Sequence, residues 1–357
     1  MSKLVYRRTV PVMGTLVTID VVGDVAGDGA DRGASQGSTP LEAAVERAFG
    51  WFQQIEECCT RFDPQSELVR LSAQVGIAFP VSAIFYEAVQ FALAVAEESG
   101  GAFDPTVGAA METRGFNREY RSGRAVRTAP QGSGSATYRD VRLDPHRKTI
   151  TLLRPLLLDL GAVAKGLAID MAARELRPFE NFAINAGGDI YVSGHNPKGG
   201  PWSVGIRHPR VRDALIDSLH VSDCAVCTSG DYERRCPEET EAEADVGGHH
   251  ILDPRSARSS RSGFSASATA SVTVLAPTAM LADALATAAF VLGPADGIAL
   301  LERFGVDGFI ITPALERHAT RGMRSDYYGL SDATILPDAE GPSIDSAGGS
   351  NGPGRSI

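Results

Sequence analysis

The stretch "LDLGAVAKGLAID", Leu158 to Asp170, joins a run of leucines to an Ala-rich segment across a glycine. This pattern predicts a buried strand, a tight turn at Gly161 and a helix. Asp159 and Lys165 stand on either side of the turn and allow two interpretations. Either they are charges at the solvent ends of a buried strand and helix, or Gly161 and Ala162 bring the backbone close to a charged ligand.

The composition is that of an ordinary globular chain that is acidic overall. It has 357 residues, 43% of them hydrophobic, and a net charge of −10 at pH 7. The negative charge argues against general nucleic-acid binding, which needs clustered Lys and Arg. No stretch reaches the roughly 20 apolar residues of a membrane span. The N-terminal stretch "MSKLVYRRTVPVMGTLVTIDV" contains neither a signal-peptide core nor a lipid-attachment cysteine. We therefore expect a cytoplasmic protein without a membrane segment.

The five cysteines form no recognisable metal-binding pattern. Cys58 and Cys59 are adjacent, and Cys224-x-x-Cys227 has no second pair at the spacing of a zinc site. The surrounding "SDCAVCTSG" is typical of a strand, so we expect buried thiols there.

Hydrophobic periodicity and turn residues predict a single mixed α/β domain over residues 1–336. Expected elements are a hairpin at 4–24, helices at 39–58, 82–99 and 278–293, two strands joined at Gly187-Gly188, and further strands at 138–143, 148–153, 202–207, 217–227, 249–252, 271–277 and 307–312. We expect mobile loops at about 23–39 and 237–248 and a disordered tail at 337–357.

Five segments share glycine or proline turns flanked by polar groups at predicted strand ends. They are "MGT" (13–15), "GGAFDPTVG" (100–108), "DLGAVAKG" (159–166), "NAGGDI" (185–190) and "HHILDP" (249–254). One such turn is most often only a turn. Five that follow apolar strands indicate loops that converge on a ligand, as they do at strand ends in α/β proteins.

Asp283 and Thr287 stand four residues apart in "PTAMLADALATAAF" and so face the same side of the predicted helix. Their neighbours are apolar, and a buried carboxylate is costly without a cation or strong donors. Carboxylate, hydroxyl and backbone carbonyl oxygens together suit Mg²⁺. Alternatively, backbone N–H groups at the helix start bind Asp283, and Thr287 bonds back to the Asp283 carbonyl. The spacing leaves both open.

In this order the motifs resemble the FAD:protein FMN transferase family, also called the ApbE or thiamine-biosynthesis lipoprotein family. The similar stretches, between residue 13 and about residue 312, are "MGTLVTID", "TRFDPQSEL", "GGAFDPTVG", "LDLGAVAKGLAID", "INAGGDIYVSG", "TSGDYER", "HHILDP" and "SVTVLAPTAMLADALATAAFVLG". The resemblance implies one α/β fold and an enzyme that cleaves FAD with the help of Mg²⁺. It would attach FMN through a phosphoester to a Thr or Ser hydroxyl of an acceptor protein and release AMP.

Individual roles follow from the resemblance residue by residue. It implies that His250 moves the proton and that Lys165 contacts phosphate or flavin. For the metal it implies the carbonyl of Ala162 with Asp283 and Thr287. For FAD it implies Met13, Phe62, Ala102, Phe103, Asp104, Asp159, Lys165, Gly188, Asp189 and Ile251.

Some positions depart from the family or keep a plainer interpretation. Ala286 stands where many members carry another oxygen-bearing side chain, and the acidic "PEETEAEADVGG" precedes His249. Phe62 and Phe103 could be core aromatics, and either histidine could be an ordinary strand-edge residue. Rival functions are a metal-dependent FAD pyrophosphatase that uses water, a non-catalytic FAD-binding protein, and a structural or interaction protein.

Overall fold

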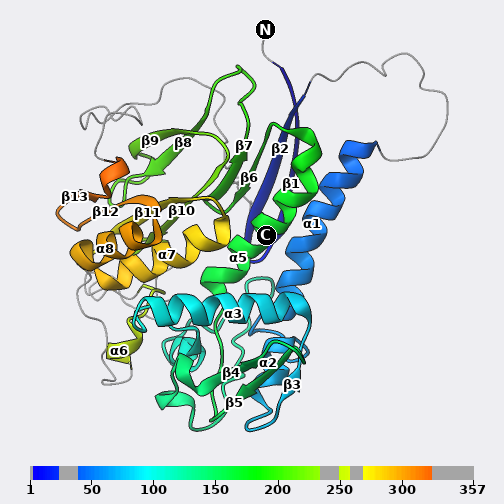
Figure 1. Cartoon of the computed structure of the whole chain (residues 1–357), viewed down its shortest axis with the longest axis vertical. Coiled ribbons are helices and arrows are strands. Elements are labelled where there is room, and N and C mark those ends of the chain that lie inside the picture. Colours follow the sequence, from blue (N-terminus) through cyan, green and yellow to red (C-terminus); the bar gives the residue numbers. More distant parts are fainter. Residues whose placement is uncertain (1–2, 24–38, 234–248, 258–267, 324–357) are drawn as a thin grey trace, which may run out of the picture.

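The computed structural model describes residues 3–23, 39–233, 249–257 and 268–323 (Figure 1). Its centre is an eight-stranded sheet in the order β1-β2-β6-β7-β10-β11-β12-β13, in which every neighbouring pair is antiparallel. The strands are β1 Leu4–Val12, β2 Thr15–Gly23, β6 Phe182–Ala186, β7 Asp189–Ser193, β10 Cys224–Gly230, β11 Ser271–Ala276, β12 Asp307–Ile311 and β13 Arg317–Ala319. The chain therefore has the mixed α/β fold that the sequence predicts.

Helices cover one face of this sheet and a second small sheet covers part of the other. The covering helices are α1 Pro40–Cys59, α5 Gly161–Leu176, α7 Ala279–Leu292 and α8 Pro294–Phe304. On β10, Ala225 and Cys227 pack in the core that the helices share, whereas Val226 packs with β8 Trp202–Arg207 and β9 Leu215–Val221. Successive strand residues thus face two covered sides of the sheet, and β11 is buried along its whole length.

A smaller lobe lies at the bottom of Figure 1. It holds the three-stranded sheet β3-β5-β4 and the helices beside it. Its elements are α2 Glu67–Ser72, β3 Phe79–Pro80, α3 Ala83–Glu98, α4 Gly108–Thr113, β4 Val141–Asp144 and β5 Thr149–Leu152. Its buried side chains, such as Leu68 and Ile150, join the same hydrophobic core as the large sheet. Within the described ranges, no helix is both long and apolar enough to cross a membrane.

Helix α5 reaches α7 through a glycine and a carboxylate. A Cβ atom on Gly166 would lie 2.5 Å from the Met280 Cα atom and 2.6 Å from the Ala279 carbonyl oxygen, so only glycine lets the backbones approach this closely. One turn further along α5, the Asp170 carboxylate accepts the N–H groups of Ala279 and Met280 at 2.7 and 3.0 Å. These two groups begin α7, and a carboxylate at a helix start also complements the helix dipole.

Most predicted elements are confirmed, with small shifts at their ends. The hairpin at 4–24 turns at Met13-Gly14, and the helices at 39–58, 82–99 and 278–293 are α1, α3 and α7. Thr39 and Glu42 form the capping box that begins α1. Cys224 and Cys227 lie in β10 as free thiols; Cys227 is buried and Cys224 half-buried. The predicted loops and the tail, at 24–38, 237–248 and 337–357, lie outside the described residues.

One strand prediction is wrong and two are only partly confirmed, for reasons visible in the backbone. The leucine run before Asp159 is buried but forms no strand: Leu157 O accepts the Gly108 N–H, and Asp159 N–H donates to Pro105 O, so its hydrogen bonds go to a loop. The predicted strand 217–227 is two strands, because the chain turns at Asp223, whose φ is 54°. Residues 138–140 are a 3₁₀ turn capped by Thr137.

The fourth difference concerns the histidine motif. Residues 250–253 have no regular secondary structure, and α6 Pro254–Ala257 follows them. Ile251 and Leu252 are both buried although they are adjacent, which a strand with one buried face does not allow. The strand predicted at 249–252 is therefore wrong, since Asp253 and Pro254 begin a helix here instead.

Candidate functional site

Two hairpin turns meet at one end of the large sheet. The β1–β2 hairpin turns at Met13-Gly14 and the β6–β7 hairpin at Gly187-Gly188, each with two residues of positive φ. Such turns match the twist of their strands, which is why glycines stand there. The Gly187 N–H donates to Leu16 O at 3.2 Å, so the two turns lie side by side. A Cβ atom on Gly187 would collide with the Thr15 side chain.

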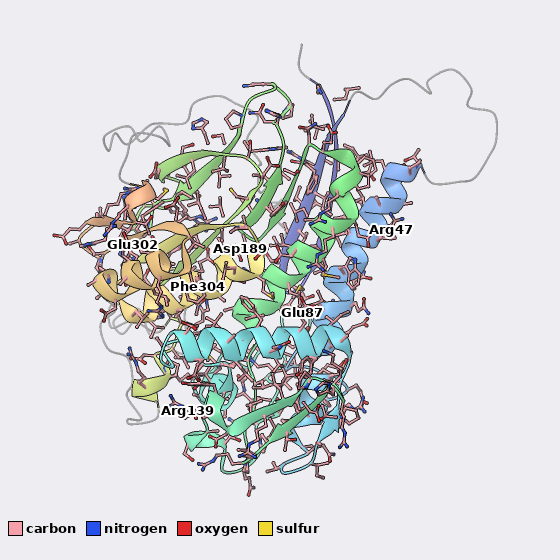
Figure 2. The ribbon with its side chains drawn as sticks, viewed as in Figure 1. Arg47, Glu87, Arg139, Asp189, Glu302 and Phe304 are labelled. Atoms are coloured by element: carbon pink, nitrogen blue, oxygen red, sulfur yellow. The ribbon has the colours of Figure 1, made fainter. Side chains whose placement is uncertain are left out.

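A lysine and two carboxylates from three different elements form the centre of the site. Lys165, in the second turn of α5, makes an ion pair with Asp189, the first residue of β7. Its Nζ atom lies 3.8 Å from the nearer carboxylate oxygen of Asp283 on α7. Both carboxylates are almost fully buried, with side-chain exposures of 3% and 7%. Figure 2 shows Asp189 in the middle of the molecule, between the sheet and α7.

The hydrogen bonds at the start of α7 bear on the two arrangements that the spacing of Asp283 and Thr287 left open. The first N–H groups of α7 donate to Asp170 and Thr278, so they do not hold Asp283. Lys165 supplies the nearby positive charge instead. The Thr287 hydroxyl lies 3.3 Å from that of Ser229 on β10, one turn along α7 from Asp283.

This donor set fits a hard divalent cation. Asp283 offers a buried carboxylate and Thr287 a hydroxyl, while Ala162 is the second residue of α5 and lies three positions before Lys165, on the same side of the helix. Hard oxygen ligands of this kind are those that Mg²⁺ prefers. Over the described ranges, no group of three or more His, Cys, Asp or Glu residues could hold a metal ion. Any metal here would therefore depend on hydroxyl and carbonyl oxygens as well.

Asp159 is not a solvent-exposed charge at the end of the leucine run, because its carboxylate is bound by other protein groups. Its Oδ2 atom accepts the Nε–H of Arg61 at 2.8 Å, and its Oδ1 atom accepts the Gly161 N–H that begins α5 at 2.9 Å. Arg61 is 8% exposed and places its guanidinium carbon 4.5 Å from the centre of the Phe62 ring. Both predicted residues, Asp159 and Phe62, thus belong to one cluster with Arg61, which the sequence analysis did not single out.

The segment 102–104 is tightly built into the fold. Ala102 and Phe103 are buried, and the Asp104 carboxylate accepts the backbone N–H and hydroxyl of Thr106 as well as the Tyr138 N–H. Asp104 therefore fixes the turn that starts a 3₁₀ helix at Pro105. Its carboxylate has a structural task whether or not the segment also contacts a ligand.

The first of the two histidines contacts α7. His249 places its ring 5.3 Å from that of Phe290, edge to face, and Phe290 is three residues after Thr287. Burial lowers the pKa of His249, and the charge of Asp231 opposes this only in part. His250 is half-buried, and Ile251 is buried in the core. Burial thus favours the neutral imidazole of His249, which is the form that can accept a proton.

Two buried groups beside the site have shifted pKa values. Burial raises the pKa of Asp170 to about 6, against the hydrogen bonds from Met280 and Ala279, which lower it. The Cys58 and Cys59 sulfur atoms lie 3.5 Å apart at the end of α1, two residues before Arg61. The hydrogen bond to Cys58 and burial together raise the pKa of Cys59 well above that of an ordinary thiol.

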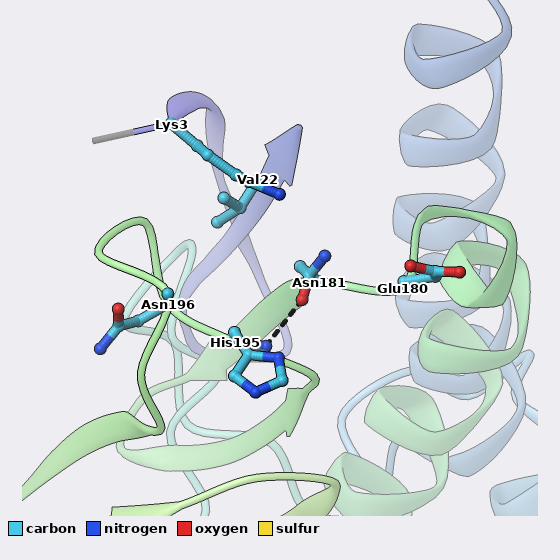
Figure 3. A pocket seen from close by; sticks show the side chains of 7 residues that line it. Lys3, Val22, Glu180, Asn181, His195 and Asn196 are labelled. Atoms are coloured by element: carbon cyan, nitrogen blue, oxygen red, sulfur yellow. Dashed lines mark hydrogen bonds between the residues drawn. The ribbon is translucent and has the colours of Figure 1, made fainter. Parts of the chain in front are cut away.

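A separate cavity of about 300 Å³ lies at the opposite ends of the strands (Figure 3). Its lining includes Glu180, Asn181 and His195, and the His195 N–H donates to the Asn181 side chain at 2.7 Å. No residue of the predicted site lines it. The converging turns, and not this cavity, therefore define the candidate functional site.

Comparison with known proteins identifies this combination of fold and site. The structure superposes on the ApbE protein of Thermotoga maritima with a TM-score of 0.72 at 29% identity, covering 90% of this chain and 98% of that one. It has the same TM-score, at 24% identity, with the flavin transferase ApbE from Vibrio cholerae. The fold is thus that of the ApbE-type flavin transferases.

The family itself is shown by the sequence. The model of the ApbE family matches residues 13–310, and the chain belongs to this family. It is 34% identical to a FAD:protein FMN transferase of Treponema pallidum over 307 residues, which cover 79% of this chain and 81% of the relative. A relative of the same name from Haemophilus influenzae is 30% identical over 70% of this chain and 72% of its own length.

Proposed function

We propose that this chain is a Mg²⁺-dependent FAD:protein FMN transferase. One observation carries the proposal: Lys165, Asp189 and Asp283 come from three elements and form one ion-paired cluster at the converging turns, inside the region that the family matches. A cluster of this kind suits a ligand that carries both negative charge and a metal ion. The names of the relatives supply the reaction class.

The substrate would lie across the turns. The FAD pyrophosphate carries two negative charges, and Lys165 together with the N-terminal end of α5 would attract it. Half-buried Met13 and Phe62 would offer apolar surface to the rest of the nucleotide, whereas Ala102, Phe103 and Ile251 are buried. Gly188, without a side chain, would let the nucleotide approach the β6–β7 turn.

Asp283, Thr287 and the carbonyl of Ala162 would hold the metal. When bound, Mg²⁺ would neutralise negative charge that grows on the phosphoryl oxygens during transfer. Lys165 already pairs with Asp189, so the protein can keep this lysine in place while Asp283 turns to the cation.

The chemical step is an in-line displacement at the FMN-side phosphorus. The acceptor hydroxyl oxygen forms the new P–O bond, the bond between the two phosphates breaks, and AMP leaves with the electron pair. A hydroxyl is a poor nucleophile near neutral pH, and a base that takes its proton typically contributes about 10²–10⁴-fold. His250 would take this proton, and neutral His249 beside it is the alternative.

Mass spectrometry of flavinylated proteins in cells with and without this chain tests the proposal. FMN on a Thr or Ser residue that disappears with the chain, and returns with wild type but not with Asp283→Ala, is the expected result. In vitro, free FMN and AMP without covalent flavin on any acceptor would show a pyrophosphatase instead. Unchanged FAD after long incubation with Mg²⁺ would show a binding protein.

A further inference from the structure

The buried guanidinium of Arg61 has one nitrogen that makes no hydrogen bond within the described part of the chain. Its Nε–H donates to Asp159 at 2.8 Å and its Nη2 to the Phe116 carbonyl, while its face lies on the Phe62 ring. Nη1 makes no hydrogen bond to any of the described residues. The side chain is 9% exposed. A buried charged donor without an acceptor is costly, so this nitrogen calls for a ligand atom.

The position of Arg61 indicates the chemistry of that ligand. The Asp159 carboxylate bridges the guanidinium and the first N–H of α5, so Arg61 stands at the positive end of a 16-residue helix. Lys165 lies in the next turn of the same helix. Asp159 alone would repel an anion at this place, but its charge is matched by Arg61. A guanidinium nitrogen also presents its two N–H groups in one plane, which suits phosphate oxygens.

We propose that Nη1 of Arg61 binds a phosphate oxygen of the nucleotide substrate, while the rest of the guanidinium neutralises Asp159. This inference rests on the proposed function, because FAD is the nucleotide concerned. Arg61 is then a binding residue for the pyrophosphate and not only part of the core. Phe62 and Phe116 hold its plane, so the donor is already oriented before the substrate arrives.

Dissociation constants of three proteins for two ligands test the inference. FAD and riboflavin share the flavin ring, but riboflavin has no phosphate. For Arg61→Lys we expect the dissociation constant for FAD, measured by fluorescence quenching, to rise about 10- to 100-fold, the range for a hydrogen bond to a charged group. Riboflavin binding should stay the same. Arg124→Gln is the matched control, since Arg124 is exposed and its loss should leave FAD binding unchanged.

The outcomes separate the possible roles. If FAD affinity stays within twofold of wild type in Arg61→Lys, the inference is overturned, whatever the thermal stability does. Equal losses for FAD and riboflavin would also overturn it, because the phosphate would then not be what Arg61 binds. Wild type that fails to bind FAD at all would instead refute the proposed function.

A crystal structure of wild type with FAD covers the case in which Arg61→Lys does not fold. Nη1 within hydrogen-bond distance of a phosphate oxygen supports the inference. Nη1 bonded only to water or to protein atoms overturns it.

Discussion

At the scale of single residues, the site depends on how charge is shared around Lys165. This lysine stands between two buried carboxylates, and only Asp189 is in direct ion-pair contact with it. Asp283 is further away and shares its helix face with Thr287. The two carboxylates therefore differ in how closely they approach the lysine, and under the proposed function Asp283 is the one that would bind the metal.

Replacing Asp283 separates turnover from substrate binding. We expect Asp283→Ala to lower the rate of FMN transfer about a hundredfold or more, since the metal acts mainly on charge that develops in the transition state. The dissociation constant for FAD should change much less. Transfer rates and FAD titrations of the two proteins measure this, with Asp296→Ala on the exposed side of α8 as the control. Transfer within a few fold of wild type would remove Asp283 from the site.

The two histidines give a second residue-scale test. His250→Asn should keep FAD binding and lose about 10²-fold in transfer rate, and it should flatten the rise of the rate with pH as an imidazole deprotonates. His249→Asn should mainly lose the contact with Phe290 and so lower thermal stability slightly. Transfer rates from pH 5.5 to 8.5 check both. The opposite pattern, with His249→Asn slow and His250→Asn normal, would make His249 the base.

The sequence predicted residues that the structure brings together, but not all their partners. Lys165, Asp189 and Asp283 were each predicted, and the structure brings them together. Arg61 was overlooked because its neighbour Phe62 carried the resemblance. Ser229 and Asp170 were also missed, since each meets its partner only through tertiary contact. Ser229 on β10 lies beside Thr287 on α7, and Asp170 on α5 accepts the N–H of Ala279 on α7. Spacing along one chain does not show such contacts.

At the scale of elements, the junction of α5 and α7 fixes the position of Lys165 relative to Asp283. Gly166→Ala should lower the free energy of unfolding by about 1–3 kcal/mol, because the added methyl group meets backbone atoms that cannot move aside. Denaturant unfolding measures this change. Gly50→Ala on α1 is the matched control, since nothing lies within 4 Å of its new Cβ atom, and it should stabilise the chain slightly. Equal effects would show that α5 and α7 are loosely packed.

The same junction makes stability depend on pH. Asp170 has its pKa raised from 3.8 to about 6 in the folded chain, so the folded state holds this proton more tightly than the unfolded state. Its contribution to stability is therefore fully present below about pH 4 and is lost as the pH rises through 6. Urea unfolding from pH 4 to 7 should show this decline in wild type relative to Asp170→Asn. Parallel profiles would mean that the bonds from α7 cancel the effect of burial.

Helices and strands were predicted correctly where the local sequence pattern determines the secondary structure. The prediction failed where distant hydrogen-bond partners determine it. The β1–β2 and β6–β7 hairpins alternate and end in glycine turns, so their sequence suffices. The leucines before Asp159 have the same apolar character as a buried strand. Their backbone groups bond to the loop at Pro105–Gly108, and nothing in the leucine run itself indicates that choice.

At the scale of the whole molecule, the site takes residues from the first strand turn to the seventh helix. Ligand binding should therefore stabilise the entire fold. FAD with Mg²⁺ at a hundred times its dissociation constant should add about 2.7 kcal/mol, or a rise in melting temperature of roughly 4 °C for a chain of this size. Differential scanning fluorimetry with FAD, with riboflavin, and with FAD plus a chelator measures it. No shift with FAD at millimolar concentration would contradict the proposed function.

The adjacent thiols at the end of α1 allow local unfolding of this region to be followed by thiol labelling. Both sulfur atoms are buried, and a thiol reagent needs an exposed thiolate. Labelling of Cys58 and Cys59 therefore has to wait until the last turn of α1 unwinds, and its rate reports how often that happens. Arg61 lies only two residues after Cys59. A substrate bound to Arg61 would keep this last turn of α1 helical. The labelling rate of Cys58 and Cys59 would then fall when the nucleotide binds and rise again when it dissociates.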